Sequence, residues 1–297
     1  MTREDFLRQL AERASLVERA LDGYLPPEDA YPQVIHRAMR YSVMGGGKRL
    51  RPVLVMSAAE TVGGRAEDVL PAACAIELIH TYSLVHDDLP AMDNDDFRRG
   101  KPTNHKVFGE AVALLAGDAL LTLAFQLLGD TKSAHPENIL KVVREVASGC
   151  GTFGLIGGQV VDTFSSSEEK MDEKTLEYIH SRKTGALYKA SVRAGAILAG
   201  AREEELQSLT EFAEYLGLAF QIKDDILDVE GDEKKLGKPV GSDIRNKKAT
   251  YPALFGLEAA RQKAREAAGK ALCALENFGD NADFLRAMVH FVVERDF

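Results

Sequence analysis

The chain has 297 residues, of which 45% are hydrophobic and 7% aromatic, and it contains no tryptophan. Lysine and arginine total 37 and aspartate and glutamate 46, which gives a formal net charge of −9. This acidic balance excludes the basic footprint of nonspecific nucleic-acid binding, although local basic clusters can still bind anions. The three cysteines, Cys74, Cys150 and Cys273, form no C-x-x-C pair and therefore indicate a reducing, cytoplasmic setting.

Helix-forming residues dominate the chain, and apolar residues recur at intervals of three and four, whereas strand signals are weak. We therefore predict an all-α protein with helices at residues 3–22, 31–43, 51–62, 67–88, 107–129, 136–150, 152–164, 172–199, 203–229, 250–276 and 280–295. Neither a repeat nor a low-complexity linker divides the sequence, so we expect one domain over residues 1–297.

The N-terminal sequence MTREDFLRQLAER interleaves charged and apolar residues, which is unlike a signal peptide. The most apolar stretch, from Ala111 to Leu128, is nearly long enough to span a bilayer. Asp118 near its centre would cost about 2.5–3.5 kcal/mol inside a membrane. We therefore expect a helix buried in a large helical protein, without stable membrane insertion.

The sequence GGGKRLRP at residues 45–52 joins two predicted helices. Its glycines let backbone N–H groups approach an anion, and Lys48 and Arg51 add positive charge. The segment is not a Walker P-loop, because neither Ser nor Thr follows Lys48 and no strand precedes the glycines. Taken alone, a flexible hinge with surface charges explains it equally well.

Asp87, Asp88 and Asp93 form a D-D-x4-D pattern at the end of an apolar predicted helix. On an unbroken helix Asp93 would lie about 120° round from Asp87. Pro90 interrupts the helix, so the chain can bring Asp93 back beside it. Such a carboxylate group suits Mg²⁺, which takes oxygen ligands. A solvated acidic loop is the alternative, but it does not explain the apolar run that leads into the acids.

A second group, Asp224, Asp225 and Asp228, lies in FQIKDDILD, with i, i+3 and i, i+4 spacings that share a helix face. At about 4 Å and an effective dielectric near 20, each pair of like charges costs on the order of 4 kcal/mol. The pattern therefore indicates a need for cations. One D-D-x-x-D is a weak motif, but two acidic groups that each end an apolar helix and precede basic residues are specific.

Three further polar features lie on predicted helices. His80 stands two turns before Asp87 on nearly the same face. The sequence KTG at residues 183–185 places a glycine where it could loosen a helix and free carbonyl groups. Gln159 and Asp162 lie in GGQVVD and could support a metal site. Each feature has an ordinary alternative: a core histidine, a tolerated helix glycine and a local polar patch.

Together these motifs resemble those of the trans-prenyltransferases (isoprenyl diphosphate synthases), with the bacterial farnesyl diphosphate synthases as the nearest subgroup. The resemblance covers nearly the whole chain in order, through GGGKRLRP, IELIHTYSLVHDDLPAMDNDDFRRGKPTNH, GDALLTLAF, GGQVVD, KTGAL, FQIKDDILD and GKPVGSD. It implies a single-domain bundle of antiparallel helices around a deep central cavity, and a homodimer.

The resemblance also implies roles for individual residues. The two metal-binding groups, which would hold three Mg²⁺ ions, are Asp87, Asp88, Asp93 and Asp224, Asp225, Asp228. The side chains that would neutralise the allylic diphosphate are Arg98, Lys183 and Lys238. The site for isopentenyl diphosphate would comprise Lys48, Arg51, His80 and Arg99. The residues that would place oxygen dipoles near a carbocation are Thr184 and Gln221.

The implied reaction joins isopentenyl diphosphate head to tail to geranyl diphosphate, and also to dimethylallyl diphosphate, through an allylic carbocation. In the family, bulk at the fifth residue before the first aspartate limits product length. That position is Tyr82, which implies a fifteen-carbon product and thus a farnesyl diphosphate synthase. A helical wheel alone points Ser83 closer to Asp87 than Tyr82. The family also closes its pocket with the C-terminal tail, which here ends at Phe297.

Three alternatives share parts of this pattern. A geranylgeranyl diphosphate synthase uses the same chemistry with a deeper pocket. A class I terpene cyclase would carry a different second metal motif and lack GGGKRLRP. A regulatory subunit would bind a catalytic partner, but such subunits tend to lose aspartates that this chain keeps.

Overall fold

The structure, a computed structural model, describes residues 1–133, 135–165, 172–230 and 250–295. In this part of the chain nearly all regular structure is helical, and the only strands, β1 (Phe97–Arg98) and β2 (Lys101–Pro102), form one short antiparallel hairpin. The prediction of an all-α protein is therefore confirmed.

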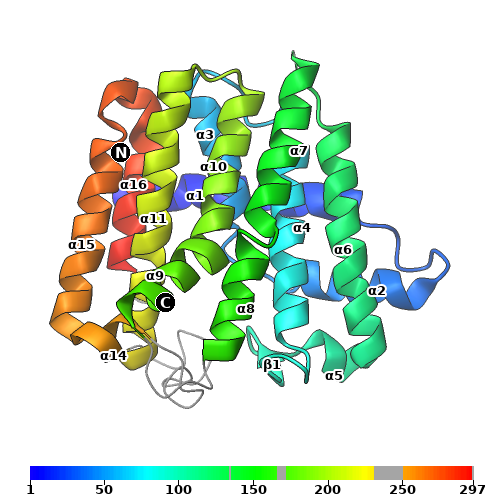
Figure 1. The fold of residues 1–297 in the computed structure, drawn as a ribbon. Helices are drawn as coiled ribbons and strands as arrows, with labels where there is room; N and C mark the ends of the chain where they lie inside the picture. The colour runs from blue at the N-terminus through cyan, green and yellow to red at the C-terminus, as the bar shows by residue number, and fades with distance from the viewer. Residues whose placement is uncertain (134, 166–171, 231–249, 296–297) are drawn as a thin grey trace.

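Most helices stand roughly upright in Figure 1, with α1 lying across the back of the bundle. The first half comprises α1 (Arg3–Tyr24), α2 (Gln33–Val43), α3 (Leu50–Thr61), α4 (Leu70–Asp87), α5 (Asn104–Phe108), α6 (Glu110–Asp130), α7 (Pro136–Cys150) and α8 (Leu155–Ser165). The second half comprises α9 (Glu173–Ile179), a π-helix η1 (His180–Gly185), α10 (Ala186–Leu198), α11 (Glu203–Glu230), α14 (Tyr251–Phe255), α15 (Leu257–Cys273), a 3₁₀-helix η2 (Glu276–Ala282) and α16 (Asp283–Glu294).

The central helices α3, α4 and α10 are apolar on almost every side, as expected for helices that other helices surround. Helix α10 packs against α3, α7 and α11, and α4 packs against α3 and α6. The outer helix α15 instead buries a stripe of alanines against α11. The core therefore fixes α4 and α11, the two helices that carry the aspartate groups.

Two predicted helices are each broken by a glycine. The predicted helix 107–129 is divided at Gly109, where φ is +84°, so that its first residues end α5 and the rest form α6. The predicted helix 250–276 is divided at Gly256, where φ is +80°, into α14 and α15. A residue with a side chain rarely adopts these left-handed values. Both glycines therefore let the chain turn sharply between two helices.

Helix α6 corresponds to the apolar stretch of the sequence. By length and composition alone it could cross a membrane, and it is the one helix among those described of which this is true. Only 39% of its most apolar window is buried within the chain, so the expectation that the helix is buried holds for one side of it. Its other side exposes Leu114 and Leu115.

A buried ion pair connects the glycine-rich loop to α4. Arg49 has a left-handed backbone, with φ of +51°, at the start of α3. Its Nη1 donates to Glu77 Oε1 of α4 at 2.7 Å, and its Nη2 donates to the carbonyl oxygen of Val43 at 2.6 Å. Both Arg49 and Glu77 are 2% exposed. The pair therefore holds the segment that carries Lys48 and Arg51 against α4.

Glu77→Ala should lower the free energy of unfolding by about 3–5 kcal/mol, because it removes the hydrogen-bonded carboxylate of the buried Arg49 guanidinium and leaves only Glu18 Oε1, 3.6 Å from Nε. The chain has no tryptophan, so the loss is measured by urea unfolding followed by far-ultraviolet circular dichroism. Arg202→Ala, which removes an exposed ion pair with Glu205, is the control and should change little. Equal effects of the two substitutions would contradict a structural role for the buried pair.

Candidate active site

Both aspartate groups lie at one end of the bundle. The carboxyl ends of α4 and α11 point toward the bottom of the molecule in Figure 1, with α8 between them. The first group follows the last turn of α4, and the second lies in the last turns of α11. Residues far apart in the sequence thus lie at the same end of the bundle.

The turn after α4 brings Asp93 back to Asp87. Helix α4 ends at Asp87, and Pro90 follows. The backbone N–H of Asp93 donates to the carbonyl oxygen of Asp87 at 2.8 Å, and that of Asn94 donates to Leu89 at 3.1 Å. The predicted return of Asp93 is therefore confirmed. The residues Asp87 and Asp93 are both partly exposed.

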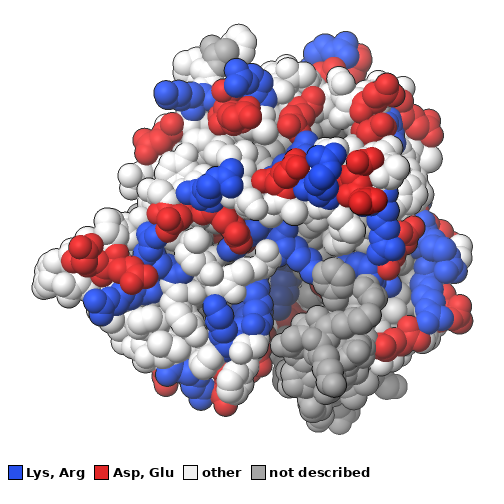
Figure 2. Space-filling view, turned by 180° about the vertical axis from the view of Figure 1, so that it is seen from behind, with Lys and Arg blue, Asp and Glu red and all other residues white. Residues whose placement is uncertain are grey.

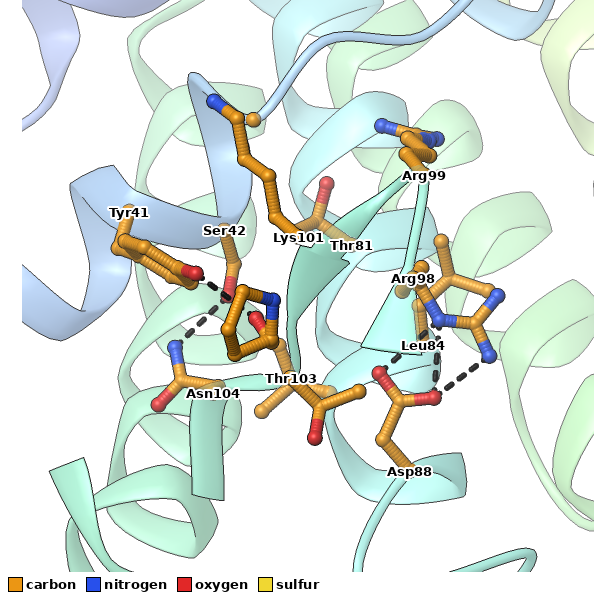
Figure 3. Close-up of a pocket in the computed structure, with 13 residues that line it drawn as sticks. Tyr41, Ser42, Thr81, Leu84, Asp88, Arg98, Arg99, Lys101, Thr103 and Asn104 are labelled. Carbon is orange, nitrogen blue, oxygen red and sulfur yellow. Dashed lines mark hydrogen bonds and ion pairs between the residues drawn. The ribbon is translucent and has the colours of Figure 1, made fainter. Parts of the chain in front are cut away.

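Asp88 differs from its two neighbours because it is 3% exposed and bound to Arg98. The Nε atom of Arg98 lies 2.9 Å from each oxygen of Asp88, and Nη2 lies 2.6 Å from Oδ1 (Figure 3). Burial raises the pKa of Asp88, an effect that the hydrogen bonds from Arg98 oppose. A predicted metal ligand and a predicted diphosphate-binding cation thus form one ion pair.

A small cavity of about 50 Å³ lies beside this ion pair, between α2 and the hairpin (Figure 3). Tyr41 donates its hydroxyl to the carbonyl oxygen of Pro102 at 2.7 Å, and Asn104 Nδ2 donates to Ser42 Oγ at 2.7 Å. The space could hold water but no isoprenoid substrate. Its polar contacts anchor the hairpin on α2 and so position Arg98.

Basic side chains lie on and around the glycine-rich loop. The guanidinium of Arg99 donates to the carbonyl oxygen of Gly46 and lies over Gly47, where an added Cβ would come within 2.7 Å of Arg99 Nη1. Arg51 lies over the ring of Tyr188, 5.0 Å from its centroid. Figure 2 shows lysine and arginine side chains gathered at a hollow on the rear face of the molecule.

His80 lies within this basic region and is neutral. Burial lowers its pKa well below the ordinary value, and the positive charges of Arg51 and Arg99 lower it further. A neutral imidazole can donate one hydrogen bond to an anion without adding charge. Lys48, on the glycine-rich loop, is partly exposed.

The aspartates of α11 lie in unlike surroundings, although the spacing predicts one shared face. Asp225 and Asp228 are 2% and 1% exposed. The side chain of Asp224 is 39% exposed and accepts a hydrogen bond from Arg295 Nη2 at 2.6 Å. Within the described ranges, no three His, Cys, Asp or Glu side chains lie close enough to form a ready-made metal site.

Asp225 is held on both of its oxygens. Oδ1 accepts from Gln221 Nε2 at 3.1 Å, and Oδ2 accepts from the backbone N–H of Tyr251 at 3.0 Å. His180 Nε2 lies 3.6 Å from Oδ2. Burial lowers the pKa of His180 to about 4, so this imidazole is neutral at pH 7. These contacts hold Asp225 in one orientation.

The KTG segment lies in the π-helix η1, which agrees with the expectation that a glycine loosens the helix here. π-Helical turns are frequent at functional sites. Thr184 donates its hydroxyl to Gln221 Oε1 at 2.7 Å, so these two predicted residues are in direct contact. Lys183 Nζ donates to Asp162 Oδ2 at 2.7 Å, which connects η1 to the GGQVVD segment on α8.

Arg295 and His180 were missed by the sequence analysis. Arg295 is almost fully buried, lies over the Phe220 ring at 4.0 Å and binds Asp224, from which 71 positions separate it. A pairing over such a distance leaves no local pattern in the sequence. Lys238 and Phe297, which the resemblance singled out, lie outside the described residues.

An apolar cavity of about 430 Å³ opens between the end of α4 and α8. Tyr82 and Asp87 line it from α4, and Ile156 and Phe164 line it from α8. Its volume falls in the range of sites for small organic ligands, about 300–1,000 Å³. Tyr82 is almost fully buried at its wall, one and a half helical turns before Asp87. The cavity therefore connects a carboxylate to a bulky aromatic side chain through an apolar space.

Comparison with known proteins assigns the chain to a family. A family model described as "Polyprenyl synthetase" matches residues 32–288. The chain is 52% identical over 256 residues to farnesyl diphosphate synthase of Geobacillus stearothermophilus, covering 86% of each protein. It is 45% identical over 296 residues to geranylgeranyl diphosphate synthase of Cyanophora paradoxa, covering 99% of this chain and 98% of that one.

The fold also matches a crystal structure of geranylgeranyl pyrophosphate synthetase from Pyrococcus horikoshii, with a TM-score of 0.89 and 34% identity. That match covers 98% of this chain and 99% of the other. The relatives divide between two product lengths but share one reaction, the elongation of a prenyl chain. The chain belongs to the polyprenyl synthetase family of trans-prenyltransferases.

Proposed function

We propose that the protein is a farnesyl diphosphate synthase, which condenses isopentenyl diphosphate with geranyl diphosphate and with dimethylallyl diphosphate. One observation carries this proposal: the apolar cavity that extends from Asp87 to the buried ring of Tyr82. A diphosphate bound at Asp87 would direct its prenyl chain into this cavity. The bulk of Tyr82 would then limit the length of the product.

Mg²⁺ suits the oxygen donors at this end of the bundle. Mg²⁺ is usually bound by one or two carboxylates together with substrate phosphates, and seldom by a cage of protein ligands alone. The partly exposed Asp87, Asp93 and Asp224 match that requirement. We propose that these three bind up to three ions directly. The remaining predicted carboxylates, which would support them from buried positions, are Asp88, Asp225 and Asp228.

Bound Mg²⁺ would stabilise the negative charge of the departing diphosphate. Arg98 and Lys183 would bind the same diphosphate by exchanging their carboxylate partners for phosphate oxygens. Lys238 has this role by sequence resemblance alone. The isopentenyl diphosphate would bind the basic region beside the glycine-rich loop, which comprises Lys48, Arg51, His80 and Arg99.

In the proposed reaction the allylic C1–O bond breaks, and diphosphate leaves with the electron pair. The double bond of isopentenyl diphosphate then attacks C1 and forms the new C–C bond. Loss of a proton from C2 to the released diphosphate creates the new double bond. The hydroxyl oxygen of Thr184 and the amide oxygen of Gln221 would stabilise the allylic cation. The apolar cavity would keep water away from it.

A geranylgeranyl diphosphate synthase is the second candidate, because a relative with that name matches along 99% of this chain. A noncatalytic subunit is the candidate from another class. Incubation of the purified protein with Mg²⁺, geranyl diphosphate and isopentenyl diphosphate distinguishes these three candidate functions. Farnesyl diphosphate as the main product supports the proposal, geranylgeranyl diphosphate supports the second candidate, and no turnover supports the subunit. EDTA should abolish turnover, and added Mg²⁺ should restore it.

We also propose a homodimer that covers the exposed side of α6. Helices α6 and α7 form one edge of the bundle in Figure 1. Large apolar side chains that are exposed on these two helices are Leu114 and Leu115 of α6 and Leu140 of α7, and Val107 of the preceding α5 is exposed as well. An exposed apolar surface of this kind is characteristic of a protein interface. The three cysteines are free thiols, which supports a cytoplasmic location.

Asp87→Asn should lower kcat by about 10²-fold or more, the scale on which loss of one electrostatic contact to a transition state reduces turnover. The rate of isopentenyl diphosphate incorporation at saturating Mg²⁺ measures the loss. Asp283→Asn makes the same chemical change in the first turn of α16 and should leave the rate unchanged. If the Asp87 variant turned over at the wild-type rate, Asp87 would not be a ligand of the proposed metal site.

Tyr82→Ala should lengthen the product beyond fifteen carbons, because it removes the aromatic ring from the wall of the cavity. Chromatography of the dephosphorylated products reports the chain length. Tyr31→Ala removes an aromatic ring that is 92% exposed and should leave the products unchanged. If the Tyr82 variant still makes farnesyl diphosphate alone, another residue limits the chain.

Leu115→Glu should convert the proposed dimer to a monomer of 32.5 kDa, because it places a charge in the apolar surface of α6. Light scattering during size-exclusion chromatography measures the mass. Leu7→Glu, on the exposed side of α1, is the matched control and should leave the mass at twice that of one chain. A wild-type monomer would contradict the dimer, and a Leu115 variant that stays dimeric would exclude this surface.

A further inference from the structure

Helix α6 has a notch at Gly117 that the imidazole of His86 fills. A Cβ atom added at Gly117 would lie 2.1 Å from His86 Nε2 and 2.4 Å from His86 Cδ2. Cβ atoms in proteins essentially never approach other heavy atoms this closely. Only glycine can therefore occupy position 117 while His86 keeps its position. His86 Nε2 also lies 2.9 Å from the carbonyl oxygen of Leu114 and 3.9 Å from Asp118 Oδ1. The imidazole is therefore held on α6, away from its own helix α4.

The same imidazole lines the apolar cavity. His86 lines the cavity together with Tyr82 and Asp87, and its ring meets that of Tyr82 edge-on at 5.7 Å between centroids. Val85, Leu89 and Ala113 form a packed apolar cluster where α6 meets the end of α4, so the space next to His86 on that face is already filled. The His86 ring already lines the cavity, so an imidazole that loses its place on α6 could enter that space.

We infer that Gly117 is a positioning residue for product length, because the space above it keeps His86 out of the path of the growing prenyl chain. The inference rests on the proposed prenyl-elongating function of the cavity. Glycine is a poor helix former, and a glycine inside a long helix calls for a packing reason. Gly129 in the same helix has nothing within 4 Å of a Cβ added there, so it has no such reason.

The test compares Gly117→Ala with Gly129→Ala, the same substitution in the same helix. Each purified protein receives Mg²⁺, dimethylallyl diphosphate and isopentenyl diphosphate, and the ratio of ten-carbon to longer products is measured. Gly117→Ala should raise this ratio by about tenfold or more, the lower end of the effect of one methyl group in an apolar pocket. Gly129→Ala should leave it at the wild-type value.

The double variant His86→Ala, Gly117→Ala identifies the cause. Without the imidazole there is nothing to displace, so its product ratio should equal that of His86→Ala alone. A merely structural role of Gly117 would lower the amount of active enzyme but would leave the ratio of products unchanged. Should Gly117→Ala fail to fold, recovery of folding in the double variant supports the contact, and continued unfolding overturns the inference.

The failures of the two proposals are distinguishable. If the wild-type protein makes no prenyl product, the proposed function is wrong and the inference falls with it. If the wild type is active but Gly117→Ala gives the same product ratio as Gly129→Ala, the inference alone is wrong. A double variant that keeps the short products of Gly117→Ala would also overturn it.

Discussion

The aspartates at the end of the bundle depend on positive side chains that lie far from them in the sequence. Examples among the described ion pairs are Asp88–Arg98, Asp162–Lys183 and Asp224–Arg295. Each pair neutralises its carboxylate, and the effect matters most at Asp88, which is 3% exposed and would be costly to bury unpaired. The protein thus balances its own charges at the site, and a metal–diphosphate complex would exchange partners with these pairs.

The sequence predicts the helices and the turn at the first aspartate group because those depend on local rules. Apolar periodicity locates the helices, and Pro90 explains why Asp93 returns to Asp87. The sequence does not predict the splits at Gly109 and Gly256, since a glycine inside an apolar helical pattern does not reveal its φ value. It also treats the aspartates of α11 alike, although burial separates Asp224 from the other two. That difference depends on packing partners such as Arg295 and Tyr251, which spacing alone cannot identify.

Helix α6 connects two proposed properties of the protein. Its inner side packs on α4 and holds His86 at Gly117, whereas its outer side exposes Leu114 and Leu115. The backbone carbonyl of Leu114 is hydrogen-bonded to His86, whereas its side chain belongs to the exposed surface. The same residue therefore contributes to both sides of the helix. A second subunit that restrained α6 would therefore also restrain His86, which lines the prenyl cavity.

The π-helix between α9 and α10 limits how the sequence can change in length. Successive residues of a helix are turned by about 100° from one another. Deleting one residue from His180–Gly185 could let the segment form an ordinary α-helix. The residues after the deletion would then be turned by about 100° relative to those before it. His180 could then keep Asp225, or Thr184 could keep Gln221, but both contacts could not survive together. The length of this segment is consequently as constrained as the identity of its side chains.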